Sequence, residues 1–145
     1  MGFGVSGSTA VIFLGVLVAT GTLYTATSNA SENVLEAQDA DAERALERTN
    51  TDITVTNATY DTGNESLTVN LTNVGSETLS VSETTLLVDN TYVDVPAANA
   101  TVDGDAGTDL WYAGENLSLV VGVDPTPERV KVITGSGVAA TEAVS

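Results

Sequence analysis

The sequence predicts a mainly β protein, in which an N-terminal transmembrane α-helix and a helical stalk precede an antiparallel β-sandwich. Two observations predict this order. Residues 5–26 contain no charged side chain, and from residue 52 onward apolar side chains recur at every second position. The first pattern is typical of a membrane span and the second of half-buried strands. We therefore divide the chain into an anchor (1–28), a stalk (29–49), a head (50–134) and a flexible tail (135–145).

The composition limits the functions that the chain can perform. It carries 20 acidic residues against 4 Lys and Arg, a net charge of −16, and it has neither Cys nor His. Such an acidic surface repels nucleic acid and anionic lipid. Disulfides, the usual zinc sites and histidine-based catalysis are excluded. The charge favours a halophilic protein, because molar salt screens the repulsion between its carboxylates.

The anchor reads VSGSTAVIFLGVLVATGTLYTA from residue 5 to residue 26. As a helix these 22 residues span about 33 Å, the thickness of a bilayer's hydrocarbon core. We expect a retained single span with the amino terminus inside, and the alternative is a signal sequence cleaved after Ala30. Two small-residue pairs suit close packing against a second helix, although a lone span rich in small residues would look the same. These pairs are Gly15 with Ala19 and Gly21 with Thr25.

Residues 31–48, which make up most of the stalk, are rich in helix formers and include no Gly or Pro. Its apolar positions are few and mostly Ala, so we expect a solvated helix rather than a buried one. Ser31 either caps a new helix, or the membrane span simply continues through it.

The head is predicted from Thr- and Val-rich segments that alternate with turn residues. Seven or eight short strands spaced about ten residues apart favour an immunoglobulin-like sandwich. Val88-Asp89-Asn90-Thr91 suits a two-residue hairpin, and Trp111 is the natural anchor of the core. The predicted strand centres are Ile53–Val55, Leu67–Leu71, Leu79–Val81, Leu86–Val88, Tyr92–Val95, Leu110–Tyr112, Leu117–Val123 and Val130–Ile133.

Candidate modification sites are numerous, whereas catalytic candidates are missing. N-x-Ser/Thr sequons favour a glycosylated outer domain, although chance matches are common in a chain rich in Asn and Thr. The acidic run from Asp103 to Asp109 resembles a calcium loop but lacks its ligand pattern, so an acidic turn is the simpler interpretation. We expect a binding protein and no enzyme, with no cofactor and no metal. The sequons lie at Asn29, Asn57, Asn64, Asn70, Asn99 and Asn116.

Several stretches resemble one family over nearly the whole chain. They are MGFGVSGSTAVIFLGV, ERTNTDITVTNATY, SLTVNLTNVGSETLSV, LLVDNTYV, DLWYAGENLSL and PERVKVITGSGVAAT. They resemble the FlaF/FlaG family of archaellum (archaeal flagellum) accessory proteins, and FlaF of salt-loving archaea in particular. The resemblance implies a stator component of the cytoplasmic membrane, whose head stands in the pseudoperiplasm. It also implies two partners, the S-layer protein and a FlaG-like protein.

Two alternatives stand beside this interpretation. The first is an archaellin or type IV pilin-like filament subunit, which also joins an apolar helix to a β-rich head. Such subunits normally carry a basic residue and Gly at a processing site before the helix, and Met1-Gly2 lacks the basic residue. The second is an unrelated surface adhesion module.

Overall fold

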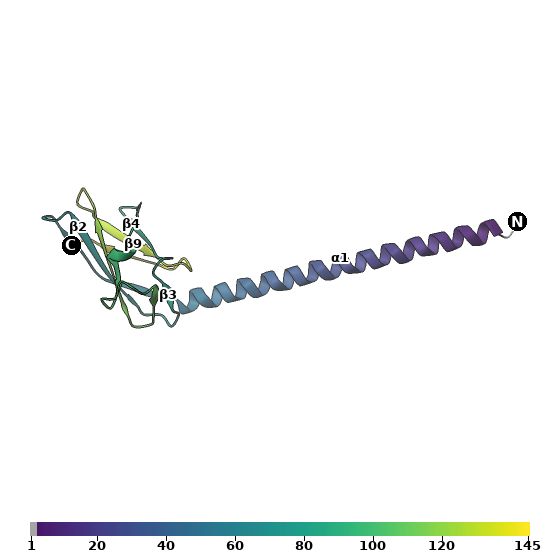
Figure 1. The fold of residues 1–145 in the computed structure, drawn as a ribbon, viewed down its shortest axis with the longest axis horizontal. Coiled ribbons are helices and arrows are strands. Elements are labelled where there is room, and N and C mark those ends of the chain that lie inside the picture. Colours follow the sequence, from purple (N-terminus) through teal and green to yellow (C-terminus); the bar gives the residue numbers. More distant parts are fainter. Residues whose placement is uncertain (1–2) are drawn as a thin grey trace. The chain divides into compact units, whose positions relative to one another are not determined.

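The structure is a computed structural model that describes residues 3–145, so Met1 and Gly2, which bear on amino-terminal processing, lie outside the described residues (Figure 1). The chain divides into two compact units, Met1–Glu43 and Arg44–Ser145. The described residues of the first unit, 3–43, are all helical. The second contains all the strands together with the last turns of the helix, so the head begins earlier than residue 50.

Helix α1 (Phe3–Asn50) is one uninterrupted helix of 48 residues. No second helix begins at Ser31, so of the two expectations for the stalk the continuing helix is the one observed. The stalk contains no Pro or Gly to break the hydrogen-bond ladder. In the apolar half, threonine hydroxyls donate to carbonyls three or four residues earlier, as Thr20 does to Val16 at 2.7 Å. Their polar groups are therefore satisfied within the helix.

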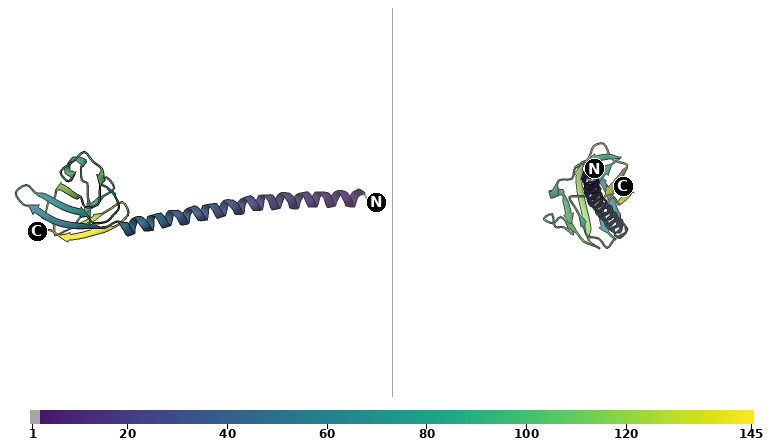
Figure 2. Two further views of the ribbon diagram at one scale, coloured as in Figure 1. Left: turned by 90° about the horizontal axis from the view of Figure 1, so that it is seen from below. Right: turned by 90° about the vertical axis from the view of Figure 1, so that its right-hand side faces the viewer.

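The head is a sandwich of two four-stranded antiparallel sheets with a small third sheet (Figures 1 and 2). One sheet has the order β1-β2-β8-β6, the other β10-β9-β4-β5, and β3 pairs with β7. The elements are β1 (Ile53–Asp61), β2 (Ser66–Asn73), β3 (Leu79–Ser80), β4 (Thr85–Val88), β5 (Thr91–Val93), 3-10 helix η1 (Ala97–Asn99), β6 (Ala100–Val102), β7 (Leu110–Trp111), β8 (Asn116–Gly122), β9 (Arg129–Ile133) and β10 (Ala139–Ala143).

The core lies between the two large sheets and follows the alternation of the sequence. On β2 every second side chain is buried. The buried side chains of β8 lie opposite them in the sheet register, with Val69 opposite Leu119. Leu86 of β4 and Val130 of β9 cover this layer from the other sheet. Trp111 is fully buried in the same cluster. The β-sandwich expected from the period of two is the observed fold.

The two sides of the sandwich are closed differently. On one side the end of the chain joins the sheets, because Ser145 exchanges backbone hydrogen bonds with Tyr60 and Ala58 at 3.1 and 3.0 Å. On the other side β5 and β6 are the last strands of their sheets, and no strand of the described chain pairs with their outer edges, although Val102 of β6 forms an isolated bridge with Asp105. This side remains open.

Three parts of the head differ from the expectation. Residues 135–145 do not form a flexible tail throughout, because residues 139–143 form β10, paired with β9 in the register Ala139 to Ile133. Strand β6 lies in a stretch for which no strand was predicted, and β3 and β7 have two residues each. The segment of β10 is made of Ala, Thr and Glu, so it lacks the alternation of large apolar side chains that identifies a strand.

The predicted two-residue hairpin is present, with Asp89 and Asn90 at φ of 48° and 67°.

Candidate functional site

The apolar half of α1 is the first candidate site. It is long and apolar enough to cross a membrane. Its large side chains lie uncovered by the rest of the described chain, with Phe13 exposed by 72% and Ile12 by 67%. Exposed apolar surface of this extent requires a nonpolar surrounding. The apolar half of α1 is therefore a candidate membrane span by its length and composition.

The four small residues proposed for helix packing lie in this half. Gly15, Ala19, Gly21 and Thr25 are all exposed, and a Cβ added at either glycine would meet nothing within 4 Å. The hydroxyl of Thr25 donates to the carbonyl of Gly21 at 3.0 Å. A partner helix would therefore contact a surface on which the hydroxyl of Thr25 already forms its hydrogen bond within α1.

The second candidate is the junction, where the last turn of α1 contacts two parts of the head, loop 74–77 and the turn between β9 and β10. The carbonyl of Asn50 accepts hydrogen bonds from the backbone N–H groups of Ser76 and Glu77 at 2.9 and 3.2 Å. The carbonyl of Asp52 likewise accepts from Val74 and Gly75. The loop thus satisfies carbonyls that a helix end leaves without partners.

Gly75 permits this close approach. A Cβ at position 75 would lie 2.5 Å from both the carbonyl oxygen of Asn50 and the backbone nitrogen of Asp52. Both contacts are with backbone, which cannot rotate away as a side chain can. Only glycine fits here without a shift of the loop.

Asn73, at the end of β2, holds the same loop from inside the head. Its side chain is completely buried. The amide nitrogen donates to the carbonyls of Glu77 at 2.8 Å and Trp111 at 3.1 Å, and the amide oxygen accepts from the N–H of Gly75 at 3.1 Å. Sequence reasoning missed this residue, although a polar residue on the buried face of an alternating strand is a usable signal.

The turn between β9 and β10 holds the helix end from the other sheet. The guanidinium Nε of Arg48 donates to the carbonyl of Ser136 at 2.9 Å. Thr51 is buried, and its hydroxyl donates to the carbonyl of Glu47 at 2.8 Å and accepts from Ser136 Oγ at 3.3 Å. Both large sheets therefore contribute to the junction.

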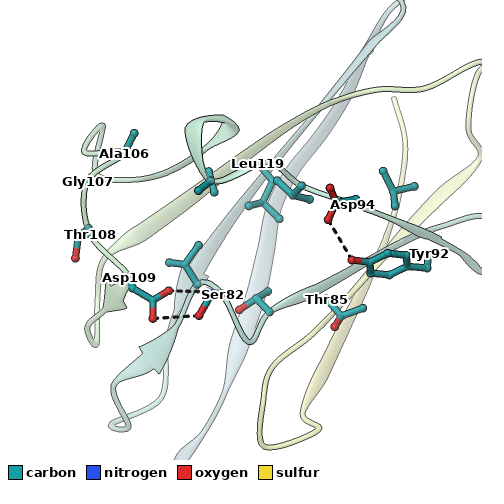
Figure 3. Close-up of a pocket in the computed structure, with 15 residues that line it drawn as sticks. Ser82, Thr85, Tyr92, Asp94, Ala106, Gly107, Thr108, Asp109 and Leu119 are labelled. Carbon is teal, nitrogen blue, oxygen red and sulfur yellow. Dashed lines mark hydrogen bonds between the residues drawn. The ribbon is translucent and has the colours of Figure 1, made fainter.

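The third candidate is a cleft of about 400 Å³ on the open side of the sandwich. It has an apolar floor with polar groups at its ends. Figure 3 shows Asp109 beside Ser82 at one end, and Asp94 with Tyr92 at the other. The N–H of Ser82, at 2.7 Å, is the main cause that lowers the pKa of Asp109, and the hydroxyl of Ser80 adds to the effect. Asp109 is thus held ionised.

The candidate glycosylation sites of the head lie on its surface. Asn57, Asn64, Asn99 and Asn116 are exposed and Asn70 is half-buried. The amide nitrogen of Asn64 donates to Asp61 at 2.7 Å, the same atom that a glycan would modify. The N–H of Gly63 and then this amide lower the pKa of Asp61. Glycosylation of these residues remains a prediction.

The acidic run from Asp103 to Asp109 forms turns in which each carboxylate binds a different backbone group. Asp103 accepts from the N–H of Asn116 at 3.1 Å, Asp105 from Gly107 at 2.7 Å, and Asp109 from Ser82. Among the described residues no group of three acidic side chains converges as metal ligands would. The observed role of the run is to shape the loop before β7.

An apolar helix that can cross a membrane, continuous with a β-sandwich, defines a helix-anchored protein with a β-rich head. The family model for archaeal-type flagellin matches residues 2–143, so this chain belongs to the archaeal-type flagellin family. Flagellins are structural proteins, which agrees with the expectation of a binding role and makes the chain a component of the archaellum. Family membership leaves the unrelated adhesion module without support.

No curated protein matches the chain. Among solved structures, it is similar to the archaellum periplasmic stator protein FlaG from Sulfolobus acidocaldarius, with 15% identity, a TM-score of 0.46, and coverage of 63% of this chain and 97% of that one. It is also similar to the periplasmic stator complex FlaF and FlaG of the same organism, with 15% identity, a TM-score of 0.43, and coverage of 62% and 85%.

Proposed function

We propose that this chain is a stator component of the archaellum, of the FlaF type, and that it works by binding. The apolar half of α1 holds it in the cytoplasmic membrane with the amino terminus inside. The head stands in the pseudoperiplasm and binds the S-layer protein, which gives the rotating filament a fixed frame. Gly15, Ala19, Gly21 and Thr25 form the proposed contact with a FlaG-like partner.

The observation that carries this proposal is the second half of α1. Residues 32–48 include six acidic residues and two arginines, and the few large apolar side chains there are exposed, Leu35 by 61% and Leu46 by 62%. A filament core built by bundling this helix along its length would bury these charges. Burying a charged group costs several kcal/mol unless it is well paired. A solvated stalk avoids that cost.

The second candidate function is a filament subunit, and the family match over residues 2–143 favours it. In that case only the apolar half, residues 5–26, would lie in the filament core. The two functions differ in what happens when the gene is removed. We expect cells without a stator component to assemble filaments that do not turn, and cells without the subunit to assemble no filament.

The experiment is therefore deletion of the gene, followed by electron microscopy of filaments and tracking of single cells. A tagged full-length chain is returned on a plasmid and crosslinked in molar salt. We expect filaments without rotation, tagged protein in the membrane fraction, and a crosslink to the S-layer protein. A control consisting of residues 1–50 fused to a fluorescent protein should stay in the membrane without that crosslink. Bald deletion cells, together with tagged chain in the sheared filaments of the complemented cells, would establish the subunit instead.

A further inference from the structure

The open side of the sandwich is built differently from the rest of the head. Strands β5 and β6 end their sheets there, and the connection between them, which contains η1, bridges the gap. On the opposite side Ser145 closes the sheets by backbone hydrogen bonds with Tyr60 and Ala58. The cleft thus occupies the place where a further strand would complete the sandwich.

The floor of the cleft is apolar and partly reaches the core. Leu119 and Ala100 contribute to it, exposed by only 3% and 7%, and Val93 and Val95 pack against the same cluster. A volume of about 400 Å³ accommodates a few aliphatic side chains, not a folded domain.

Strand β5 supplies backbone groups along this floor. It pairs with β4 on one side only, with Leu86 opposite Val93 and Leu87 opposite Tyr92. Alternate N–H and C=O groups of such an edge strand point away from its sheet and are free to pair with another chain. Tyr92, exposed by 63%, stands beside this edge, and tyrosine is enriched at protein interfaces.

The charge of the cleft has one sign. Asp94 and Asp109 line its two ends, and its lining includes no Lys or Arg among the described residues. Hydrogen bonds position both carboxylates: Asp94 accepts from Tyr92 Oη at 3.3 Å, and Asp109 accepts from Ser82 Oγ at 3.2 Å. A second copy of this chain, with a net charge of −16, would be repelled from this surface.

We propose that the cleft binds an extended segment of a partner protein that adds as a strand to the edge of β5. The segment places aliphatic side chains on the floor and a Lys or Arg beside Asp94 or Asp109. Backbone pairing supplies affinity in this mode, and pockets for alternate side chains supply specificity. The inference rests on the proposed function only for the identity of the partner.

The test uses the full chain in detergent micelles, with a six-residue peptide of alternating Val and Lys as the probe. Binding is measured by fluorescence anisotropy and located by amide chemical shifts. Ala97→Trp fills the cleft, and Ala98→Trp is its matched control, since both residues are exposed on η1 and only Ala97 lines the cleft. Asp94→Asn and Asp124→Asn remove the same charge, at the cleft and away from it.

We expect the largest shifts at Tyr92, Val93 and Asp94, and about a tenfold loss of affinity in Ala97→Trp against no loss in Ala98→Trp. Asp94→Asn should weaken binding about threefold, and Asp124→Asn should have a smaller effect. Equal binding by both Trp variants, or shifts spread evenly over the acidic surface, would overturn the inference. Because the proposed function is tested by filament assembly and rotation in cells, it would survive that result.

Discussion

Replacement of Asn73 tests how the head holds the end of its helix. In Asn73→Ala the carbonyls of Glu77 and Trp111 lose the amide that donates to them. The N–H of Gly75 keeps one partner, since it also donates to the carbonyl of Asp52 at 2.9 Å. The variant therefore leaves two acceptors without this donor and opens a cavity at a completely buried position.

Each lost hydrogen bond costs about 0.5–1.5 kcal/mol, and the cavity left by the side chain adds to this loss. Water reaches the carbonyl of Glu77 more easily than that of Trp111, because Glu77 is only half-buried and Trp111 is fully buried. We therefore expect the free energy of unfolding to fall by about 3 kcal/mol. For a unit of this size the melting temperature should fall by roughly 15 °C.

The assay is urea and thermal unfolding of the full chain, followed by circular dichroism. The matched control is Asn70→Ala on the same strand, whose half-buried side chain lies on the opposite face and should change stability by less than about 0.5 kcal/mol. Asn73→Asp keeps the shape but cannot donate while ionised, so it should regain stability on acidification. A loss below about 1 kcal/mol in Asn73→Ala would refute the reasoning.

Three further predictions follow from the head. Gly75→Ala should cost about 2 kcal/mol and expose the amides of Ser76 and Glu77 to hydrogen exchange, because its Cβ meets backbone at 2.5 Å. Gly122→Ala, whose Cβ lies 3.9 Å from its neighbour, is the control, and equal protection in both variants would contradict the prediction. The folded pKa of Asp109 is lowered, so its contribution to stability is present above the unfolded pKa and lost as the pH falls through the folded pKa. Asp109→Asn should therefore flatten the acid side of a melting-temperature curve, and an unchanged slope would count against it. Finally, the chain should lose strand signal in circular dichroism as salt falls from molar to low millimolar, because its charge of −16 is then unscreened; an unchanged spectrum would exclude salt dependence.

The sequence predicted those parts of the fold in which one periodic signal dominates. The uncharged run of residues 5–26 identified the apolar helix, and alternation in β2 and β8 identified the central strands. Strand β10 was missed because its small and polar residues carry no such signal, and it is a strand only because β9 pairs with it. Pairing between distant segments is a tertiary effect that local composition does not encode.

The junction and the cleft could not be predicted from the sequence, because each is formed by segments that only the fold brings together. The role of Gly75 depends on the helix end that packs against it, and nothing in its neighbouring sequence indicates that contact. Asp94 and Asp109 lie in different loops, and only the fold places both at one cleft. Trp111, in contrast, was predictable as a core residue from its size and its apolar neighbours in the sequence.

The junction also determines which strands bear a mechanical load applied to the head through its last helical turn. The covalent chain leads from Asn50 directly into β1, an edge strand that could be unzipped one hydrogen bond at a time. Loop 74–77 and Ser136 divert part of that load to β2 and β9, each of which has neighbours on both sides. A pull then acts on many hydrogen bonds at once. We therefore expect the junction to raise the force at which the head unfolds, because the load no longer acts on the edge strand alone.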